Sequence, residues 1–192
     1  LTGEANDYVG KGMSGGEIII RPPENRSFDP AVNSILGNTV MYGASNGSLF
    51  ANGCGGERFC VRNSGATAVV EGIGDHGCEY MTNGTVVVLG TAGKNFGAGM
   101  SGGAAYILDE DERFDKIFNP EMVEIIRVEA GSKHEAQLKG LIERHDELTD
   151  SGKAAEILGD WDGFRQKFWR VQPKSNVAEV TTKESKAKAV SK

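Results

Sequence analysis

The chain has 192 residues, a formal net charge of −6 and an isoelectric point near 5.2. This length allows one domain with a sizeable core, and the acidic balance argues against nucleic-acid binding, which usually needs a basic face. No apolar run approaches the roughly 18 residues of a membrane span, and no signal peptide opens the chain. Three scattered cysteines indicate a reducing compartment rather than a disulfide scaffold.

Glycine and proline divide the chain into two regions. Residues 1–108 hold 22 of the 27 glycines, and all five prolines lie outside residues 31–108. Proline has no amide hydrogen to donate to a β-ladder, so a long stretch without it favours a continuous sheet. We therefore expect a glycine-rich sheet region followed by a charged C-terminal extension.

A repeat runs through the glycine-rich region. The first expected strand, Glu17–Ile20, precedes an 11-residue insertion that begins at Arg21. After it, short apolar runs recur every 19 residues, near Ser48, Thr67, Val86 and Ala105. The segments Gly10–Gly16 and Gly97–Gly103 also match at six of seven positions, 87 residues apart. Self-similarity at a fixed period is the sequence signature of a solenoid.

Writing the sequence in rows of 19 places similar residues in columns. The three columns are Phe50, Val69, Val88 and Ile107; Ile35, Cys54, Ile73 and Ala92; and Val40, Phe59, Cys78 and Gly97, with Ile20 beneath Phe50. An antiparallel sandwich would also have short strands and glycine turns, but it would not need columns in register. We predict an all-β fold, a right-handed parallel β-helix of single-stranded coils with about 19 residues each.

The C-terminal extension carries a different pattern. A further strand is predicted at Val123–Val128, and a helix is predicted over residues 133–148 from the spacing of Leu138, Leu141, Ile142, His145 and Leu148. Two shorter helices are expected at Gly152–Leu158 and Trp161–Lys167. The predicted domains are the β-helix over 1–130, a small helical extension over 131–173, and a disordered tail over 174–192.

A Gly-x-Gly-x-x-Gly motif, Gly72–Gly77, follows the expected strand Ala68–Val70. A nucleotide-binding interpretation requires a helix after the motif, whose N-terminus would bind a pyrophosphate. Another strand is expected there instead, and the glycines fit the 19-residue spacing. We therefore interpret them as structural, with nucleotide binding as the alternative.

Four other groups of residues resemble reactive or metal-binding sites. Cys54, Cys60 and Cys78 suggest an iron–sulfur site, but the columns place Cys60 and Cys78 on different sides of a coil, so we expect buried thiols. Asp75 and His76 are sequence neighbours that should point to opposite faces, which argues against a general-base pair. The acidic run Asp109–Glu112 lacks calcium-loop spacing. His134 and His145 are predicted to face solvent. No catalytic, cofactor-binding or metal-binding residue is therefore predicted.

Several longer stretches resemble the C-terminal glycine-rich repeat (GXGXG) domain of the glutamate synthase large subunit. They are Asn6–Gly16, Asn46–Gly53, Arg62–Ala66, Gly74–Met81, Asn95–Gly103 and the end from Trp161 to Pro173. The resemblance covers residues 1–173. Because the first residue is Leu1 rather than Met, we expect a fragment of a longer polypeptide.

The resemblance implies a part of an enzyme that makes two glutamates from glutamine, 2-oxoglutarate and two electrons. It implies that FMN and an iron–sulfur cluster belong to other domains, with no cofactor in this segment. The implied role is a scaffold whose partners are the amidotransferase and FMN-binding domains and an electron-donor subunit, without nucleic acid or membrane. The expected location is the cytoplasm, or the plastid in a photosynthetic eukaryote. The alternatives are a stand-alone glycine-rich subunit and a nucleotide-binding module of another redox enzyme.

Overall fold

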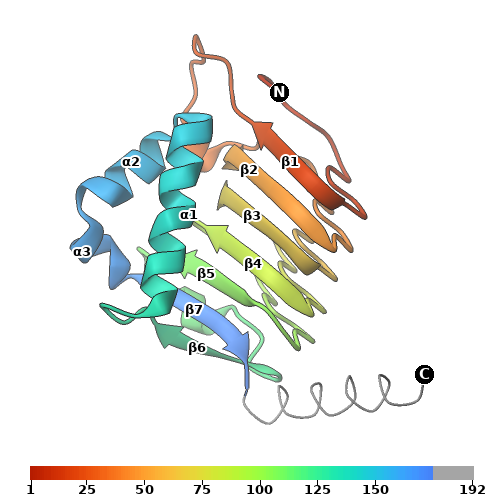
Figure 1. The fold of residues 1–192 in the computed structure, drawn as a ribbon, viewed down its shortest axis with the longest axis vertical. Helices are drawn as coiled ribbons and strands as arrows, with labels where there is room; N and C mark the ends of the chain where they lie inside the picture. Colours follow the sequence, from red (N-terminus) through yellow and green to blue (C-terminus); the bar gives the residue numbers. More distant parts are fainter. Residues whose placement is uncertain (175–192) are drawn as a thin grey trace.

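A computed structural model describes residues 1–174 and contains a seven-stranded sheet whose strand order is β1-β2-β3-β4-β5-β7-β6 (Figure 1). The strands are β1 (Ser14–Ile20), β2 (Asn46–Cys54), β3 (Ser64–Gly72), β4 (Asn83–Val88), β5 (Ala104–Leu108), β6 (Val123–Arg127) and β7 (Phe168–Pro173). The helices are α1 (Lys133–Thr149), α2 (Gly152–Gly159) and α3 (Trp161–Arg165), with short 3-10 turns η1 (Pro30–Val32) and η2 (Phe114–Lys116).

Strands β1 to β5 pair in parallel with their neighbours in sequence, as successive coils of one solenoid do. The last two strands differ, because β7 pairs antiparallel with both β5 and β6. Each coil returns to the sheet through a turn on the far side, so stacked coils enclose a core. The structure confirms the predicted β-helix with a small helical C-terminal extension.

The strand register corrects the predicted columns. Val69 pairs with Val87 rather than Val88, and Ile19 rather than Ile20 pairs with Phe50. The pairing of β2 with β3 shifts by one residue between Ala51 and Cys54, which shortens the third coil at its corner. The pairing of β3 with β4 shifts between Ser64 and Thr67, which places Val69 opposite Val87. A shift of one residue turns a side chain to the opposite face of the sheet.

Two apolar cores lie on the two faces of the sheet. The first fills the interior of the solenoid, with fully buried members such as Val70, Val88 and Phe59. The second lies between the sheet and the helices and contains Phe50 and Val69. Figure 1 shows the helices covering one face of the sheet. Phe50 and Val69 therefore belong to the helix-facing core, whereas Val88, predicted in their column, belongs to the solenoid core.

The turn on the far side of each coil contains three alternate residues with positive φ. They form three columns across five coils: Tyr8, Thr39, Arg58, His76 and Asn95; Gly10, Met41, Cys60, Cys78 and Gly97; and Gly12, Gly43, Arg62, Tyr80 and Gly99. Their amide groups bond to neighbouring coils, for example Arg58 N to Asp75 O and His76 N to Lys94 O, at 2.9 and 2.8 Å. Left-handed backbone is uncommon outside glycine, so this repeated conformation defines the corner.

The C-terminal extension follows the sequence pattern with shifted ends. Helix α1 begins after the N-cap Ser132, whose hydroxyl accepts from the Glu135 amide at 3.1 Å. Helix α3 ends at Arg165 rather than the predicted Lys167, because β7 begins at Phe168. That strand returns to the sheet and pairs with β5, so the extension contributes to both layers. The predicted disordered tail lies outside the described residues from position 175 onward.

None of the helices within residues 1–174 is long and apolar enough to cross a membrane.

Candidate functional site

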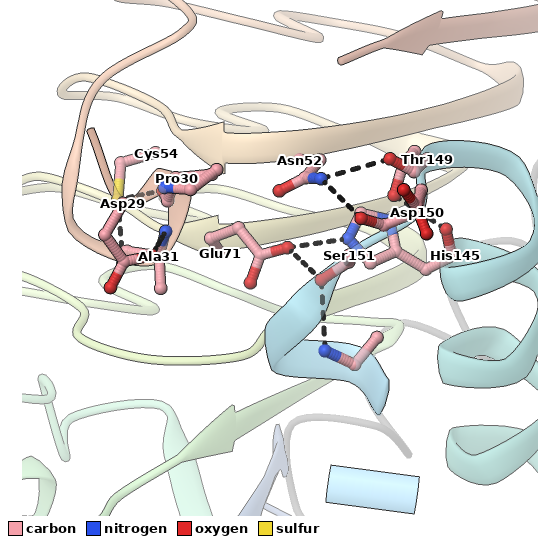
Figure 2. Close-up of polar contacts among 11 residues, drawn as sticks. Asp29, Pro30, Ala31, Asn52, Cys54, Glu71, His145, Thr149, Asp150 and Ser151 are labelled. Carbon is pink, nitrogen blue, oxygen red and sulfur yellow. Dashed lines mark hydrogen bonds and ion pairs between the residues drawn. The ribbon is translucent and has the colours of Figure 1, made fainter. Parts of the chain in front are cut away.

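A buried polar cluster lies where the helical extension contacts the solenoid (Figure 2). Its centre is Glu71, at the end of β3, which is 1% exposed. One carboxylate oxygen of Glu71, Oε1, accepts hydrogen bonds from Ser151 Oγ at 2.6 Å and His145 Nε2 at 2.9 Å. His145 and Ser151 are 0% and 1% exposed, so the contacts are shielded from water. Shielding strengthens such contacts and makes an unpaired charge costly.

The cluster also holds the junction between α1 and α2. The Asn52 side-chain amide, from β2, donates to the carbonyls of Thr149 and Asp150 at 3.0 and 3.2 Å. These carbonyls belong to the end of α1, where a helix has no acceptor partners of its own. Ser151 is the N-cap of α2 and accepts from the Ala154 amide at 3.0 Å. Two strands and two helices are therefore connected through a few buried side chains.

The combination of serine, histidine and glutamate resembles the composition of a hydrolase triad. In a triad the imidazole lies between the hydroxyl and the carboxylate, so that it can take the hydroxyl proton. Here the carboxylate of Glu71 lies in the middle, and both Ser151 and His145 bond to the same oxygen. The imidazole has no direct contact with the hydroxyl in the described part of the chain. The geometry is that of a structural connection rather than an activated nucleophile.

Two polar atoms of the cluster have no hydrogen-bond partner within residues 1–174, Glu71 Oε2 and His145 Nδ1. A cavity of about 220 Å³ adjoins the cluster and is bordered by Glu71, Asn52 and Arg26. Oε2 has almost no accessible surface, however, so a ligand in this cavity would not reach it without a rearrangement. The unpaired atoms make the cluster sensitive to substitution but do not form a binding site.

The prediction that His145 faces solvent is wrong. Its ring is fully buried and stacks on Phe50 with the ring centroids 6.2 Å apart. The helical spacing already placed His145 in line with Leu138 and Ile142, on the face that packs on the sheet. The partner Glu71 lies 74 residues away in sequence, so no local pattern connects the two side chains.

The motif Gly72–Gly77 lies at a coil corner. Strand β3 ends at Gly72, and the chain passes through the positive-φ turn into β4 without a helix, so the requirement of a dinucleotide-binding motif is not met. A Cβ at Gly77 would lie 2.5 Å from Ile73 Cδ1 and 2.9 Å from a ring carbon of Phe96. Close packing between coils accounts for this glycine.

The cysteine interpretation needs one correction. Cys60 and Cys78 occupy the same corner column, rather than different sides, because the third coil is one residue shorter. Both are fully buried, and burial raises the pKa of each thiol well above its ordinary value. Cys54 is partly exposed, and burial, followed by the charges of Glu71 and Asp29, raises its pKa to about 11. Iron–sulfur ligation needs thiolates, which these surroundings disfavour.

Asp75 and His76 do not form a pair. Asp75 Oδ1 accepts from the Lys94 amide of the next coil at 2.7 Å, and His76 Nδ1 contacts Glu79 Oε1 at 2.8 Å. Asn95 donates to the same Glu79 oxygen at 2.9 Å. Both polar groups therefore contribute to contacts between or within coils.

The acidic run Asp109–Glu112 is partly structural. Asp109 is buried, and its carboxylate accepts from the amides of Arg113 and Phe114 and from Trp169 Nε1 at 2.9, 3.2 and 2.9 Å. No cluster of three or more histidine, cysteine or acidic side chains suited to a metal ion occurs within residues 1–174. His134 is partly buried, and burial followed by the charge of Arg170 lowers its pKa.

Comparison with known proteins gives a consistent result. A family model described as "GXGXG motif" matches residues 1–174. The chain is 57% identical over 175 residues to the chloroplastic ferredoxin-dependent glutamate synthase of Spinacia oleracea, and 56% identical to ferredoxin-dependent glutamate synthase 2 of Synechocystis sp.. Ferredoxin-dependent glutamate synthase 1 of Arabidopsis thaliana, chloroplastic/mitochondrial, is also 56% identical. Each match covers 91% of this chain, which spans about 11% of the relative's length.

Proposed function

The chain belongs to the GXGXG motif family, and we propose that it is the scaffold domain of a ferredoxin-dependent glutamate synthase. The relatives' names and the identity across 91% of the chain support this assignment. The parent protein would convert glutamine, 2-oxoglutarate and reductant into two glutamates, with FMN and an iron–sulfur cluster in its other domains. Relatives described as chloroplastic support a plastid location in a plant.

The observation that carries the scaffold role is the continuity of the main-chain ladder. Parallel strands bond from β1 to β5, and the far corner of each coil bonds to the next one as well. Each coil is therefore bonded to the next both along the sheet and along the opposite corner. The Glu71 cluster fixes the helices to the same stack through fully buried contacts.

We infer that this segment supplies position rather than chemistry. No residue of the family's catalytic machinery is matched here by resemblance, and the serine–glutamate–histidine cluster lacks the order of a triad. Holding an ammonia-releasing domain and a flavin domain at a fixed separation protects the transfer between them. A misplacement of about 1 Å in a reacting geometry costs roughly 100-fold in rate.

The experiment compares the parent polypeptide with a variant lacking residues 1–173. We expect glutamine hydrolysis to continue while glutamine-dependent glutamate formation falls more than formation from added ammonium. The ratio of glutamate formed to glutamine hydrolysed measures the coupling of the two sites. An unchanged ratio in a folded deletion variant would contradict the scaffold role.

The alternative function is a stand-alone subunit or a nucleotide-binding module. A melting experiment with nucleotide or FMN tests binding, since ligand at 100 times its dissociation constant raises stability by about 2.7 kcal/mol. The intact mass of the native polypeptide that carries this sequence tests the stand-alone form. A fused enzyme would be several times heavier than the 20.5 kDa of this chain.

A further inference from the structure

One corner of the solenoid carries a repeated pair of main-chain hydrogen bonds. The Gly55 amide donates to Gly72 O at 2.8 Å, and Gly56 O accepts from the Gly74 amide at 3.1 Å. One coil further, the Ile73 amide donates to Thr91 O at 2.9 Å, and Gly74 O accepts from the Gly93 amide at 3.1 Å. Each pair of adjacent residues thus binds a three-residue extended segment of the next coil.

The next level of this pattern is empty. By the same register the Ala92 amide and the Gly93 carbonyl should bond to the following coil. Within residues 1–174 neither group has a main-chain or side-chain partner. After β5 the chain departs from the solenoid path, and the Asp109 amide donates to Lys167 O, next to β7, at 3.2 Å. The Ala92 amide and the Gly93 carbonyl are therefore positioned to bond to a parallel extended segment.

A cavity of about 350 Å³ lies where the missing segment would run. Ala92 and Gly93 form its floor, and Leu108, Phe114 and Ile117 contribute apolar walls. Three of the four acidic residues in the lining are occupied: Asp109 by two amides and Trp169, Glu110 by Lys153 at 2.7 Å, and Asp75 by the Lys94 amide at 2.7 Å. The fourth, Asp111, shares the lining with the cationic Lys94 and Arg113. These bonds and charges disfavour a cation, whereas the free amide and carbonyl of the floor favour a main chain.

We propose that this cavity binds an extended segment from the rest of the parent polypeptide, which completes the missing level of the corner. This proposal rests on the proposed function, because the segment must come from the rest of the parent polypeptide. In the relatives about nine-tenths of the length lies outside the part that matches this chain. Addition of a strand to an exposed edge is a recurrent mode of recognition, in which main-chain bonds give affinity and side-chain pockets give specificity.

The chemistry of the segment follows from the levels below. The equivalent three residues are Cys54-Gly55-Gly56, Gly72-Ile73-Gly74 and Thr91-Ala92-Gly93. Their shared features are small outer residues and a middle position that points toward the core, where Ile73 is 6% exposed. The occupant is therefore a small–apolar–small segment whose middle side chain contacts the apolar walls.

Hydrogen exchange of the native polypeptide that carries this sequence tests the main-chain bond. Amides resolved individually allow Ala92 to be compared with Ile73, its equivalent one coil below. We expect the Ala92 amide to exchange at least about 100-fold more slowly than an unstructured amide, as bonded amides in stable elements do. Exchange of Ala92 at the unstructured rate, with Ile73 protected, would overturn the proposal.

A photo-cross-link identifies the occupant. The probe p-benzoyl-L-phenylalanine is placed at exposed Arg113 on the cavity rim, with the same probe at exposed Glu143 on α1 as the matched control. The expected product joins position 113, and not position 143, to one segment outside residues 1–192 of the same polypeptide. A cross-link within residues 1–192 contradicts the proposal, and so does a cross-link to a second copy of the polypeptide. The absence of any cross-linked product contradicts it as well.

The two proposals fail separately. Glutamine-dependent glutamate formation by the same preparation tests the proposed function, whatever the cross-link shows. A synthase with an unprotected Ala92 would refute the occupied corner alone. A protected Ala92 and a specific cross-link in a protein without synthase activity would refute the proposed function alone.

Discussion

The buried Glu71 cluster should couple the stability of the solenoid to that of the helices. His145→Leu removes the imidazole that donates to Glu71 Oε1 at 2.9 Å and leaves a carboxylate with Ser151 as its remaining partner. Leaving a buried polar group without one of its hydrogen-bond partners costs about 1–3 kcal/mol. For a domain of this size that loss lowers the melting temperature by roughly 2–12 °C.

The double variant Glu71→Leu/His145→Leu separates this penalty from packing. Replacing both partners by apolar side chains removes the buried carboxylate and leaves the buried Ser151 hydroxyl as the group that loses a partner. A hydroxyl costs less to leave unpaired than a carboxylate, so we expect the double variant to be more stable than His145→Leu by about 1 kcal/mol. Urea unfolding, followed through the fluorescence of Trp161 and Trp169, gives each free energy of unfolding with its slope. Both tryptophans lie in the C-terminal extension and report on its detachment.

Additivity would refute this reasoning. If the double variant loses the sum of the two single losses, Glu71 and His145 contribute independently and the contact is not energetically coupled. A change in the urea slope of His145→Leu would instead show that the helices detach before the solenoid unfolds. The control is Asp162→Asn on α3, which removes an exposed charge outside the cluster and should change stability by less than about 0.5 kcal/mol.

Three further outcomes follow from the corner and the extension. Gly12 and Gly99 share a φ of +67°, but a Cβ added at Gly12 meets no atom within 4 Å, whereas one added at Gly99 lies 2.5 Å from a ring carbon of Tyr80. Urea unfolding should therefore show that Gly12→Ala lowers the free energy of unfolding by about 1 kcal/mol, and that Gly99→Ala lowers it by roughly 1–3 kcal/mol more. At pH 8 the folded protein should react slowly with Ellman's reagent, because burial raises the pKa of Cys54 to about 11, whereas the unfolded protein should expose three thiols. Rapid reaction of three thiols in the folded protein would contradict this expectation. The hydrogen bond from Trp161 lowers the pKa of Glu135 below its ordinary value of 4.5. The contribution of this carboxylate to stability is therefore complete above pH 4.5 and is lost as the pH falls through the pKa of the folded state. A Glu135→Gln variant should lose less stability in acid than the unsubstituted chain.

Periodicity predicts the solenoid because each coil repeats the same local requirements. Glycine spacing, apolar runs and the proline-free stretch all report on one stacked unit, so their agreement identified the fold. The same periodicity combined residues of two registers in each of the three columns, since an exact spacing of 19 cannot show that β3 skips one residue against β2 and again against β4. Each skip follows from contacts between coils, and no single row of the sequence records it.

The Glu71 cluster is hidden from local sequence patterns for a different reason. Glu71 looks like an isolated charge in a charge-poor strand, and His145 looks like a polar interruption of a helix face. Each is unusual in its own element, and a buried polar side chain requires a partner. The two residues are therefore candidates for pairing with each other. Sequence separation of 74 residues hides it from any local pattern.

The corner explains where glycine is needed. Of its fifteen positive-φ positions within the described residues, ten are not glycine. Left-handed backbone costs about 1–2 kcal/mol for such a residue, so ten of them would cost as much as the whole stability of a typical domain unless neighbours offset it. Inner coils have a bonded coil on both sides and bury corner side chains such as Met41, Cys60 and Cys78 completely. In the first and last coils two of the three positions are glycine, although the last corner is covered by the segment 117–119, where Ile117 O accepts from the Asn95 amide at 2.8 Å. Glycine, which adopts this conformation without a Cβ clash, is therefore concentrated in the two end coils of the repeat.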